Sequence, residues 1–280
     1  MSSMTTEQPS DQNLLLIGIF ARVHLLGGTV VRKVPRSTSE EDAQPILHEA
    51  DIYSLLGDHP RIAQCLSIGR IDHVDVKYYP KGDIVIYLQK NQDSIAPSLR
   101  SKWFRQIIEA VHNLHEHGVI HSDLALRQFF VEVDLDARLG DFDSSQYPGR
   151  MALGYEKASH CLPRDCEEPN TIMSDIFALG STLYELIAGK APYSELYPIE
   201  PEAVLRSSDL AVILARIDRG RQVDTKIETL YTQQVFPDVS TFAGGDIILA
   251  CWKGYFTTAN DALLRLGQDG FMQERTGPCR

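Results

Sequence analysis

The stretch VIHSDLALRQFF, residues 119–130, decides the fold that we expect for this chain. Asp123 lies near its middle, and a second acidic residue, Asp141 in LGDFDSS, follows 18 positions later. The runs FFVEV and ARLGDF between them are β-like, so we predict a hairpin that brings both aspartates together. Such a pair suits phosphoryl transfer, because one carboxylate can orient the attacking hydroxyl while the other holds Mg²⁺ on the phosphates. Taken alone, either aspartate is more often a turn residue or a cap, but that explanation is much weaker for the pair.

The chain after residue 98 has a mostly helical pattern. A stripe of apolar residues at helical spacing predicts one long amphipathic helix: Trp103, Phe104, Ile107, Ile108, Val111 and Leu114. A second helix is predicted over SDIFALGSTLYELIAG, with Ser174 as its N-cap and Gly189 at its C-terminal end.

The chain before residue 90 is dominated by short β-rich runs. The predicted strands there are LLLIGIF, RVHLL and TVVRKV, with Gly27-Gly28 as the turn between the last two. One helix interrupts them, with Pro45 in its first turn and with Gly57 and Pro60 closing it. Two further predicted strands follow, CLSIGRI and HVDVKYY.

These two halves predict an α+β fold with two lobes. We expect a disordered tail at residues 1–12 and one domain over residues 13–280. Its small β-rich lobe covers about residues 13–80 and its larger helical lobe about residues 81–280, with the polar segment QKNQDSIAPS near the boundary. The cleft between two such lobes is a favoured place for a ligand.

Composition narrows the class of protein. The 27 basic and 38 acidic residues give a formal net charge of −11 with no dense basic run, so we expect neither nucleic acid nor an anionic membrane as partner. The five cysteines are scattered without a CxxC pair, which favours reduced thiols and a cytoplasmic or nuclear location. We find no signal peptide and no apolar stretch long enough to span a membrane.

Several motifs stand in the order that one family shows. VVRK, ILHEADIYSLLGDHPRI, HSDLALRQ, LGDF, LPRD and SDIFALGSTLYELIAGKAPY together make the chain resemble a protein kinase domain, from about Leu14 to about Leu266. The last motif is the most specific, because small-molecule phosphotransferases of the aminoglycoside kinase type share the aspartate motifs but not this helix. There, Asp175 would anchor the catalytic loop from below. The resemblance implies that the chain uses ATP with Mg²⁺ or Mn²⁺ on a protein substrate.

The resemblance also implies the residues of the nucleotide site. Lys33 is the candidate phosphate-binding lysine, with Arg32 as its rival one position earlier, and strand alternation places Lys33 on the same face as Val31. Glu49 resembles the helix glutamate that pairs with this lysine. Read without the family, a solvated pair is the less favoured interpretation of Arg32 and Lys33, whereas a surface position on an amphipathic helix is the favoured one for Glu49. Backbone groups of the hinge and contacts from the glycine-rich loop complete this nucleotide site: Lys77, Tyr78, Tyr79, Gly18, Ala21, Val23 and Val31.

The catalytic loop shows both agreement with the family and departures from it. Asp123 would be the catalytic residue that orients the attacking hydroxyl, and Arg127 would serve the phosphate, as in the tyrosine-kinase form of the motif. Asp141 and Gln128 would hold the metal, although the family has asparagine where this chain has Gln128. Ser122 replaces an arginine that usually couples to a phosphorylated activation segment.

Two further departures concern the nucleotide and the metal. The best register for the glycine-rich loop keeps only Gly18 of three glycines, which compromises backbone approach to phosphate. Asp143 replaces the glycine of Asp-Phe-Gly and adds a negative charge near the metal. The sequence therefore leaves two functions open: an ATP-dependent protein kinase with an atypical metal site, or a pseudokinase that acts as a binding scaffold.

Overall fold

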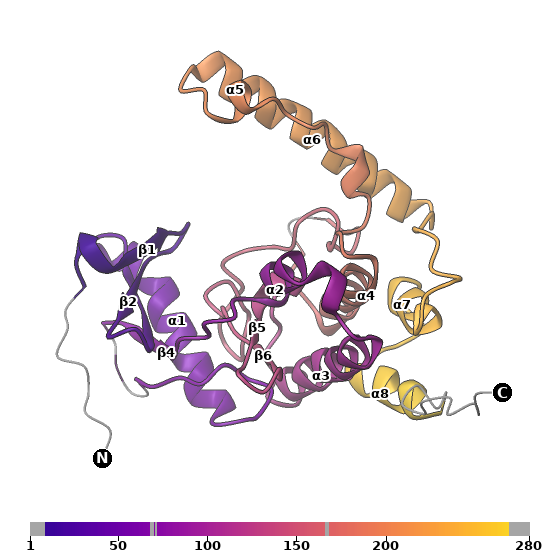
Figure 1. Cartoon of the computed structure of the whole chain (residues 1–280), viewed down its shortest axis with the longest axis horizontal. Coiled ribbons are helices and arrows are strands. Elements are labelled where there is room, and N and C mark those ends of the chain that lie inside the picture. Colours follow the sequence, from indigo (N-terminus) through magenta and orange to yellow (C-terminus); the bar gives the residue numbers. More distant parts are fainter. Residues whose placement is uncertain (1–8, 68–69, 71, 166–167, 269–280) are drawn as a thin grey trace.

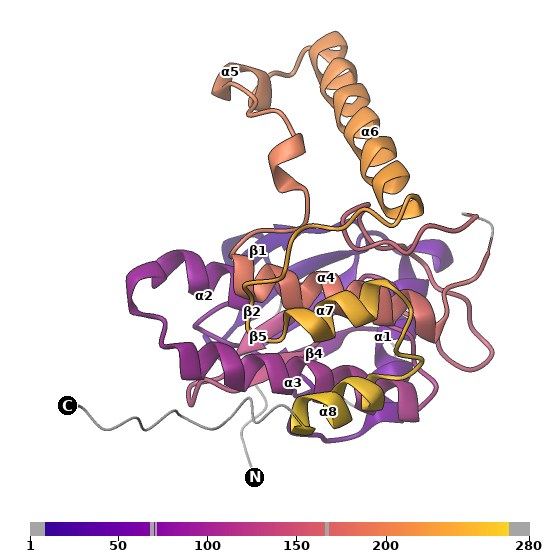
Figure 2. The same ribbon diagram turned by 90° about the vertical axis from the view of Figure 1, so that its right-hand side faces the viewer.

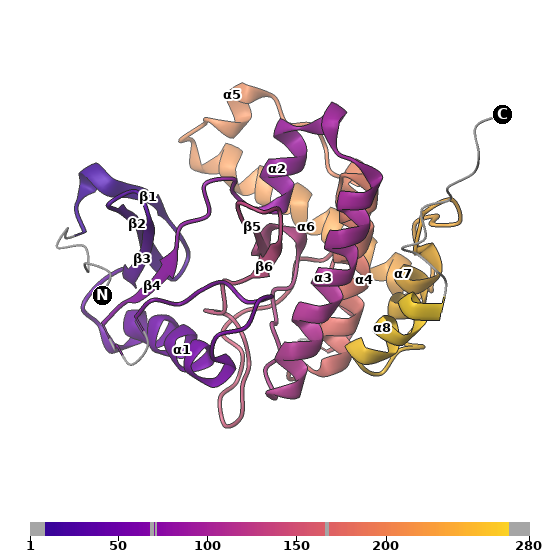
Figure 3. The ribbon, with the colours of Figure 1, turned by 60° about the horizontal axis from the view of Figure 1, so that its bottom comes forward.

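The computed structural model describes residues 9–67, 70, 72–165 and 168–268 of the 280-residue chain. A small antiparallel sheet with one helix beside it forms one lobe, and a group of helices forms the other (Figures 1 and 3). The predicted α+β fold with a small β-rich lobe and a larger helical lobe is confirmed.

The sheet of the small lobe has the strand order β1-β2-β3-β4. Its strands are β1 (Leu14–Ile17), β2 (Ala21–Leu26), β3 (Val30–Pro35) and β4 (Val74–Lys77). Gly27 and Gly28 form the predicted β2–β3 turn with φ angles of 55° and 67°, a backbone region that favours glycine. Between β1 and β2 the chain turns within three residues, and the Gly18 N–H donates to the Ala21 carbonyl at 2.8 Å.

Helix α1 (Glu40–Leu56) packs on the sheet and begins earlier than predicted. Ser39 caps it by accepting a 3.1 Å hydrogen bond from the Asp42 N–H, and three acidic residues in the first turn complement the helix dipole. Pro45 therefore lies inside the helix and not in its first turn. Gly57, with a φ angle of 64°, ends the helix as predicted.

Two other expectations for the small lobe were wrong. CLSIGRI does not form a strand where the structure describes it. The Ser67 hydroxyl accepts a 2.7 Å hydrogen bond from the Asp75 N–H, where a strand would pair backbone with backbone, and Cys65 forms only an isolated bridge with Val76. Residues 68, 69 and 71 of that run lie outside the described residues. The expected tail was also too long: a 3-10 helix, η1 (Asp11–Asn13), contacts β2, while residues 1–8 lie outside the described part.

The larger lobe is built on α3 (Pro97–Glu116) and α4 (Ile172–Ala188). The apolar stripe predicted for α3 is fully buried, and α3 packs against both α4 and α8 (Ala259–Gln268). Helix α4 packs against α7 (Gly245–Trp252) and ends at Gly189 as predicted. Its N-cap is Thr171 and not Ser174: the two residues form a capping box, in which each hydroxyl accepts the backbone N–H of the other at 3.3 and 3.0 Å.

The remaining elements all follow β4 along the chain. They are α2 (Ile84–Lys90), η2 (Gln92–Ser94), η3 (Leu126–Gln128), β5 (Phe129–Val131), β6 (Ala137–Leu139), η4 (Ser194–Leu196), α5 (Glu202–Leu205) and α6 (Leu210–Thr232). Strands β5 and β6 pair as the predicted antiparallel hairpin. Helix α2 contacts β5 and η3, so it packs with elements of the larger lobe. Helices α5 and α6 project from the large lobe (Figure 2), and no helix in the described part has the length and apolar character of a membrane span.

Candidate active site

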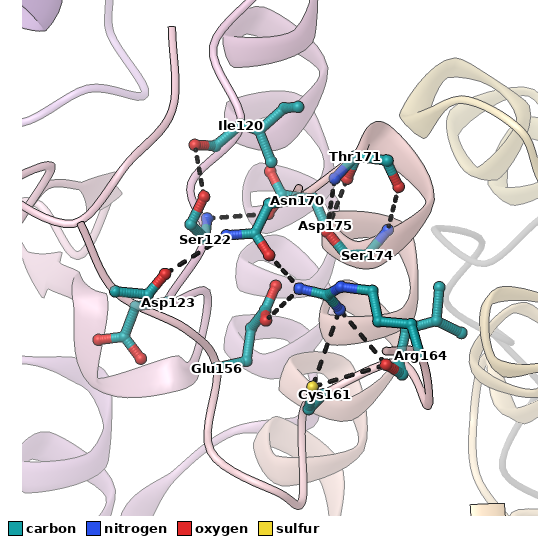
Figure 4. Close-up of polar contacts among 12 residues, drawn as sticks. Ile120, Ser122, Asp123, Glu156, Cys161, Arg164, Asn170, Thr171, Ser174 and Asp175 are labelled. Atoms are coloured by element: carbon teal, nitrogen blue, oxygen red, sulfur yellow. Dashed lines mark hydrogen bonds and ion pairs between the residues drawn. The ribbon is translucent and has the colours of Figure 1, made fainter. Parts of the chain in front are cut away.

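A buried aspartate on α4 organises the loop that contains Asp123. The Asp175 carboxylate accepts the backbone N–H group of His121 at 2.7 Å. It also accepts that of Ser122 at 3.1 Å (Figure 4). Its side chain has no exposed surface, so these charge-assisted hydrogen bonds form away from water. Ser122 has a φ angle of 66°, a left-handed conformation that places two successive N–H groups on one carboxylate.

Asp123 is held by two side chains from the same loop. Arg127 Nη2 lies 2.6 Å from both oxygens of its carboxylate, and Gln128 Nε2 donates to its Oδ2 at 2.8 Å. The Asp123 side chain remains 23% exposed, so one side of the carboxylate is open to an incoming hydroxyl. Gln128 is almost fully buried, with its amide nitrogen turned toward Asp123.

The hairpin joins this loop to the loop that carries Asp141. The Gly140 N–H donates to the Gln128 carbonyl at 3.0 Å, and the His121 ring lies 3.2 Å from the Gly140 carbonyl. Asp141 itself has a φ angle of 66°. The two aspartates predicted from the sequence therefore lie on loops that are hydrogen-bonded to each other.

Lys33, and not Arg32, reaches Glu49. The Lys33 ammonium lies 3.0 Å from Glu49 Oε1 and 2.9 Å from Oε2, and it also contacts Asp141 Oδ1. Arg32 instead forms a bidentate pair with Asp75, with both N–O distances at 2.7 Å. Neighbouring residues of β3 thus point to opposite faces of the sheet, as strand alternation requires.

The charges around Lys33 are unbalanced. Asp143 adds a third carboxylate 3.9 Å from Lys33 Nζ. Burial disfavours the ammonium, but Asp141 and Glu49 outweigh that effect and raise the pKa of Lys33 well above its usual value. Burial likewise disfavours the charged form of Asp141, but Lys33 outweighs it and lowers the pKa of that carboxyl. Lys33 and Asp141 are therefore both ionised at neutral pH.

The other two carboxyl groups are less easily ionised. Burial raises the pKa of Glu49 to about 7, with Lys33 opposing the shift. Burial also raises the pKa of Asp143, and the positive charge of Lys33 again opposes the shift. A cation that reached this cluster would relieve the repulsion among its negative charges.

The acidic cluster fits a hard divalent cation. Oxygens of Glu49, Asp141 and Asp143 lie within 4.8 Å of one another, and carboxylate oxygens are the ligands that Mg²⁺ and Mn²⁺ take. Glu49 is fully buried and paired, whereas the Asp141 side chain is 35% exposed. Asp141 and Asp143 are therefore the carboxylates that a metal could reach from the cleft.

The predicted nucleotide contacts lie along the middle of the small sheet. Val31 is paired with Val76 of β4, and Val23 is paired with Lys33 across β2 and β3. Ala21 is buried at the start of β2, next to the tight turn that begins at Gly18. Apolar side chains thus lie beside the lysine, the combination that an adenine and its phosphates require.

The hinge segment presents one free backbone donor. The Lys77 N–H donates to the Gln64 carbonyl at 2.9 Å and the Tyr78 N–H to the Thr29 carbonyl at 2.8 Å. Among the described residues, the Tyr79 N–H has no acceptor. The Tyr79 side chain is fixed, because its hydroxyl accepts the Gln64 N–H at 3.0 Å and its ring stacks on another aromatic ring. Among the described hinge residues, Tyr79 is therefore the one whose backbone N–H is free to donate.

Arg164 of the LPRD motif forms a structural ion pair that the sequence analysis did not identify. The structure places the Arg164 guanidinium between Glu156, at 3.5 Å, and the Asn170 side chain (Figure 4). Burial raises the pKa of Glu156 to about 7, because Arg164 compensates only part of the cost of burying its charge. No local sequence pattern marks Glu156 as the partner, since the contact depends on how the segment folds back.

Comparison with known proteins agrees with this geometry. The model of the family described as protein tyrosine and serine/threonine kinase matches residues 27–211. The chain belongs to the protein kinase family. It is also 27% identical over 199 residues to the serine/threonine-protein kinase PLK4 of Nematostella vectensis, over 67% of this chain and 19% of that relative. The kinase chain thus spans about a fifth of the length of the curated relative.

Family membership confirms the resemblance on which the site residues were chosen. The matched residues 27–211 contain Lys33, Glu49, Asp123, Asp141 and Asp175 of the kinase, but they begin after the glycine-rich loop. The part of the nucleotide site that departs most from the family is therefore also the part that the family model leaves unmatched.

Proposed function

We propose that this protein is an ATP-dependent protein kinase that transfers the γ-phosphoryl group to a protein hydroxyl through an atypical metal site. The observation that carries the proposal is the assembled charge cluster, in which Lys33 contacts both Glu49 and Asp141. Burying an ammonium between two elements is costly unless it is paired, and a nucleotide site gives that arrangement a purpose.

Each residue of the loop has a separate role in this proposal. Asp123 accepts a hydrogen bond from the substrate hydroxyl and orients it for attack, in the position that Arg127 and Gln128 fix. Arg127 also offers positive charge to the phosphoryl group during its transfer. Lys33 holds the phosphates and the Tyr79 N–H holds the adenine. Bound Mg²⁺ or Mn²⁺ would supply positive charge to the phosphates, with Asp141, Asp143 and Gln128 as the residues to hold it.

Gln128 makes the metal site atypical. Its side chain is one methylene longer than asparagine, and in the structure its Nε2 donates to Asp123. Its remaining amide oxygen must therefore serve any metal from a displaced position. Mg²⁺ demands near-ideal octahedral geometry, so we expect weak transfer that Mn²⁺ stimulates.

The second candidate function is a pseudokinase scaffold. It is favoured by the same cluster, since three carboxylates already surround Lys33 and compete with nucleotide phosphates. The glycine-poor β1–β2 turn, closed by the Gly18–Ala21 hydrogen bond, further restricts backbone approach to phosphate. A scaffold would keep the fold and bind its partner without transferring phosphate.

Nucleotide binding and phosphoryl transfer separate the two functions. Titration calorimetry with ATP, in Mg²⁺ and then in Mn²⁺, measures binding, and incorporation of labelled phosphate into the protein measures transfer. The kinase proposal predicts both, with transfer lost in Asp123→Asn while binding persists. A scaffold would show no transfer under either metal. The substrate is a protein of unknown identity, and a cytoplasmic or nuclear location is proposed from the scattered cysteines.

A further inference from the structure

The segment that follows Asp141 is fastened to the catalytic loop on one side. Ile120 and Gln146 exchange two backbone hydrogen bonds, both at 2.8 Å. The Ser145 hydroxyl donates to the His121 carbonyl at 2.9 Å, and the Ser145 N–H donates to the Phe142 carbonyl at 3.1 Å. Residues 142–146 are therefore fixed relative to the large lobe.

The same segment is fastened to α1 on its other side. The Tyr147 hydroxyl donates to Asp51 Oδ2 at 2.7 Å. The Tyr147 ring meets the His48 ring edge-on, with 4.8 Å between the ring centroids, and His48 Nε2 also contacts the Ser145 carbonyl. Two side chains of α1, one a turn of helix after the other, thus contact residues 145–147.

These groups keep their hydrogen-bonding roles at neutral pH. Burial lowers the pKa of His48, which leaves the ring neutral, so Nε2 must carry the proton that it donates to the Ser145 carbonyl. Burial, with Asp51 beside the hydroxyl, raises the pKa of Tyr147 to about 12, so the phenol remains a donor.

The contacts on α1 flank Glu49. His48 precedes it and Asp51 follows two positions later, so a shift of α1 away from the sheet would break all three connections together. We propose that Tyr147 and Asp51 are positioning residues that latch α1 to the segment after Asp141 and so hold Glu49 against Lys33. The inference rests on the proposed kinase function, because its consequence for catalysis is the placement of Lys33.

The latch also explains how the kinase can work with Ser122. That side chain is buried and donates to the Ile120 carbonyl at 3.2 Å, so it cannot reach residues 145–147 as an arginine could. The uncharged Tyr147 then holds the segment in place, a role that a phosphate paired with an arginine has in other kinases. Phosphate on Tyr147 would remove the donor and place negative charge beside Asp51, so modification there would open the latch.

The test removes the hydrogen bond and little else. Tyr147→Phe keeps the ring that contacts His48, Asp51→Ala removes the acceptor, and Asp51→Asn retains an oxygen that can accept. Tyr155→Phe is the matched control, since Tyr155 lies on the same segment and is 61% exposed. The two readouts are ATP affinity by calorimetry and backbone hydrogen exchange of α1 without nucleotide.

We expect Tyr147→Phe and Asp51→Ala each to weaken ATP binding roughly fivefold and to speed exchange around residue 51. The double variant should lose no more than either single one, because both remove the same bond, and Asp51→Asn should recover most of the loss. Equal effects from Tyr155→Phe, or unchanged exchange in Tyr147→Phe, would overturn the latch. If the wild type binds no ATP but α1 of Tyr147→Phe still exchanges faster than in the wild type, the kinase function is refuted and the latch stands.

Discussion

The Lys33 ammonium lies within 3.0 Å of both carboxylate oxygens of Glu49, across the gap between β3 and α1. Glu49 has no exposed surface, so its charge depends on this one cation. The pair fixes the distance between the helix and the sheet, and it directs Lys33 toward Asp141 in the cleft.

Replacing the lysine should therefore affect nucleotide binding far more than replacing its neighbour. We expect Lys33→Met to weaken ATP binding at least about tenfold, because a charged hydrogen-bond donor to the phosphates is lost. Arg32→Met should leave ATP affinity within about twofold, since Arg32 pairs with Asp75 on the other face of the sheet. Calorimetry with both variants measures the difference, and a larger loss from Arg32→Met would show that Lys33 does not hold the phosphates.

Shortening Gln128 should improve the metal site. In Gln128→Asn the amide oxygen can approach a metal as it does in other kinases, so transfer with Mg²⁺ should rise and the preference for Mn²⁺ should narrow. The measurement is the ratio of transfer rates in the two metals for the wild type and the variant. An unchanged ratio would mean that Gln128 serves only to hold Asp123, through its 2.8 Å hydrogen bond.

Activity should not require phosphorylation of the segment after Asp141. Ser122 offers no guanidinium to a phosphate on Ser144, Ser145, Tyr147 or Tyr155. Phosphatase treatment of the purified protein should therefore not lower the transfer rate. A tenfold loss, about 1.4 kcal/mol of barrier, would reveal another basic residue that couples to a phosphate there.

Glu156 should make stability depend on pH between about 4.5 and about 7. The folded-state pKa of Glu156 is about 7, above its usual 4.5. Its contribution to the free energy of unfolding is therefore full below about pH 4.5 and is lost as the pH rises through about 7. Relative to the wild type, Glu156→Gln should gain about 2 kcal/mol in unfolding free energy between about pH 5 and about pH 8. Denaturant melts measure this difference. Glu168→Gln, which changes an exposed glutamate, is the control and should show no such gain.

Local patterns were enough to predict the frame of the site. The hairpin between Asp123 and Asp141 follows from two short β-like runs, and the choice of Lys33 over Arg32 from strand alternation. The start of α1 was predicted wrongly because Pro45 was taken as its first turn, although Ser39 and the acids after it are the stronger signal.

The contacts that tune the site were beyond sequence reasoning. Tyr147 meets Asp51 across 96 positions of the chain, and Arg164 meets Glu156 only because the segment folds back on itself. Neither pair has a periodic or motif signal, since each depends on tertiary packing. Polar side chains such as these decide orientation within the site, whereas the apolar pattern decides only which elements form.

Transfer of labelled phosphate from ATP in the presence of Mn²⁺ tests the central claim most directly, with wild type, Asp123→Asn and Gln128→Asn compared side by side. The account predicts weak incorporation by the wild type, none by Asp123→Asn, and more by Gln128→Asn when Mg²⁺ is the metal. If the wild type binds no ATP with either metal, and Gln128→Asn restores neither binding nor transfer, the loop around Asp123 is not catalytic and the protein is a scaffold.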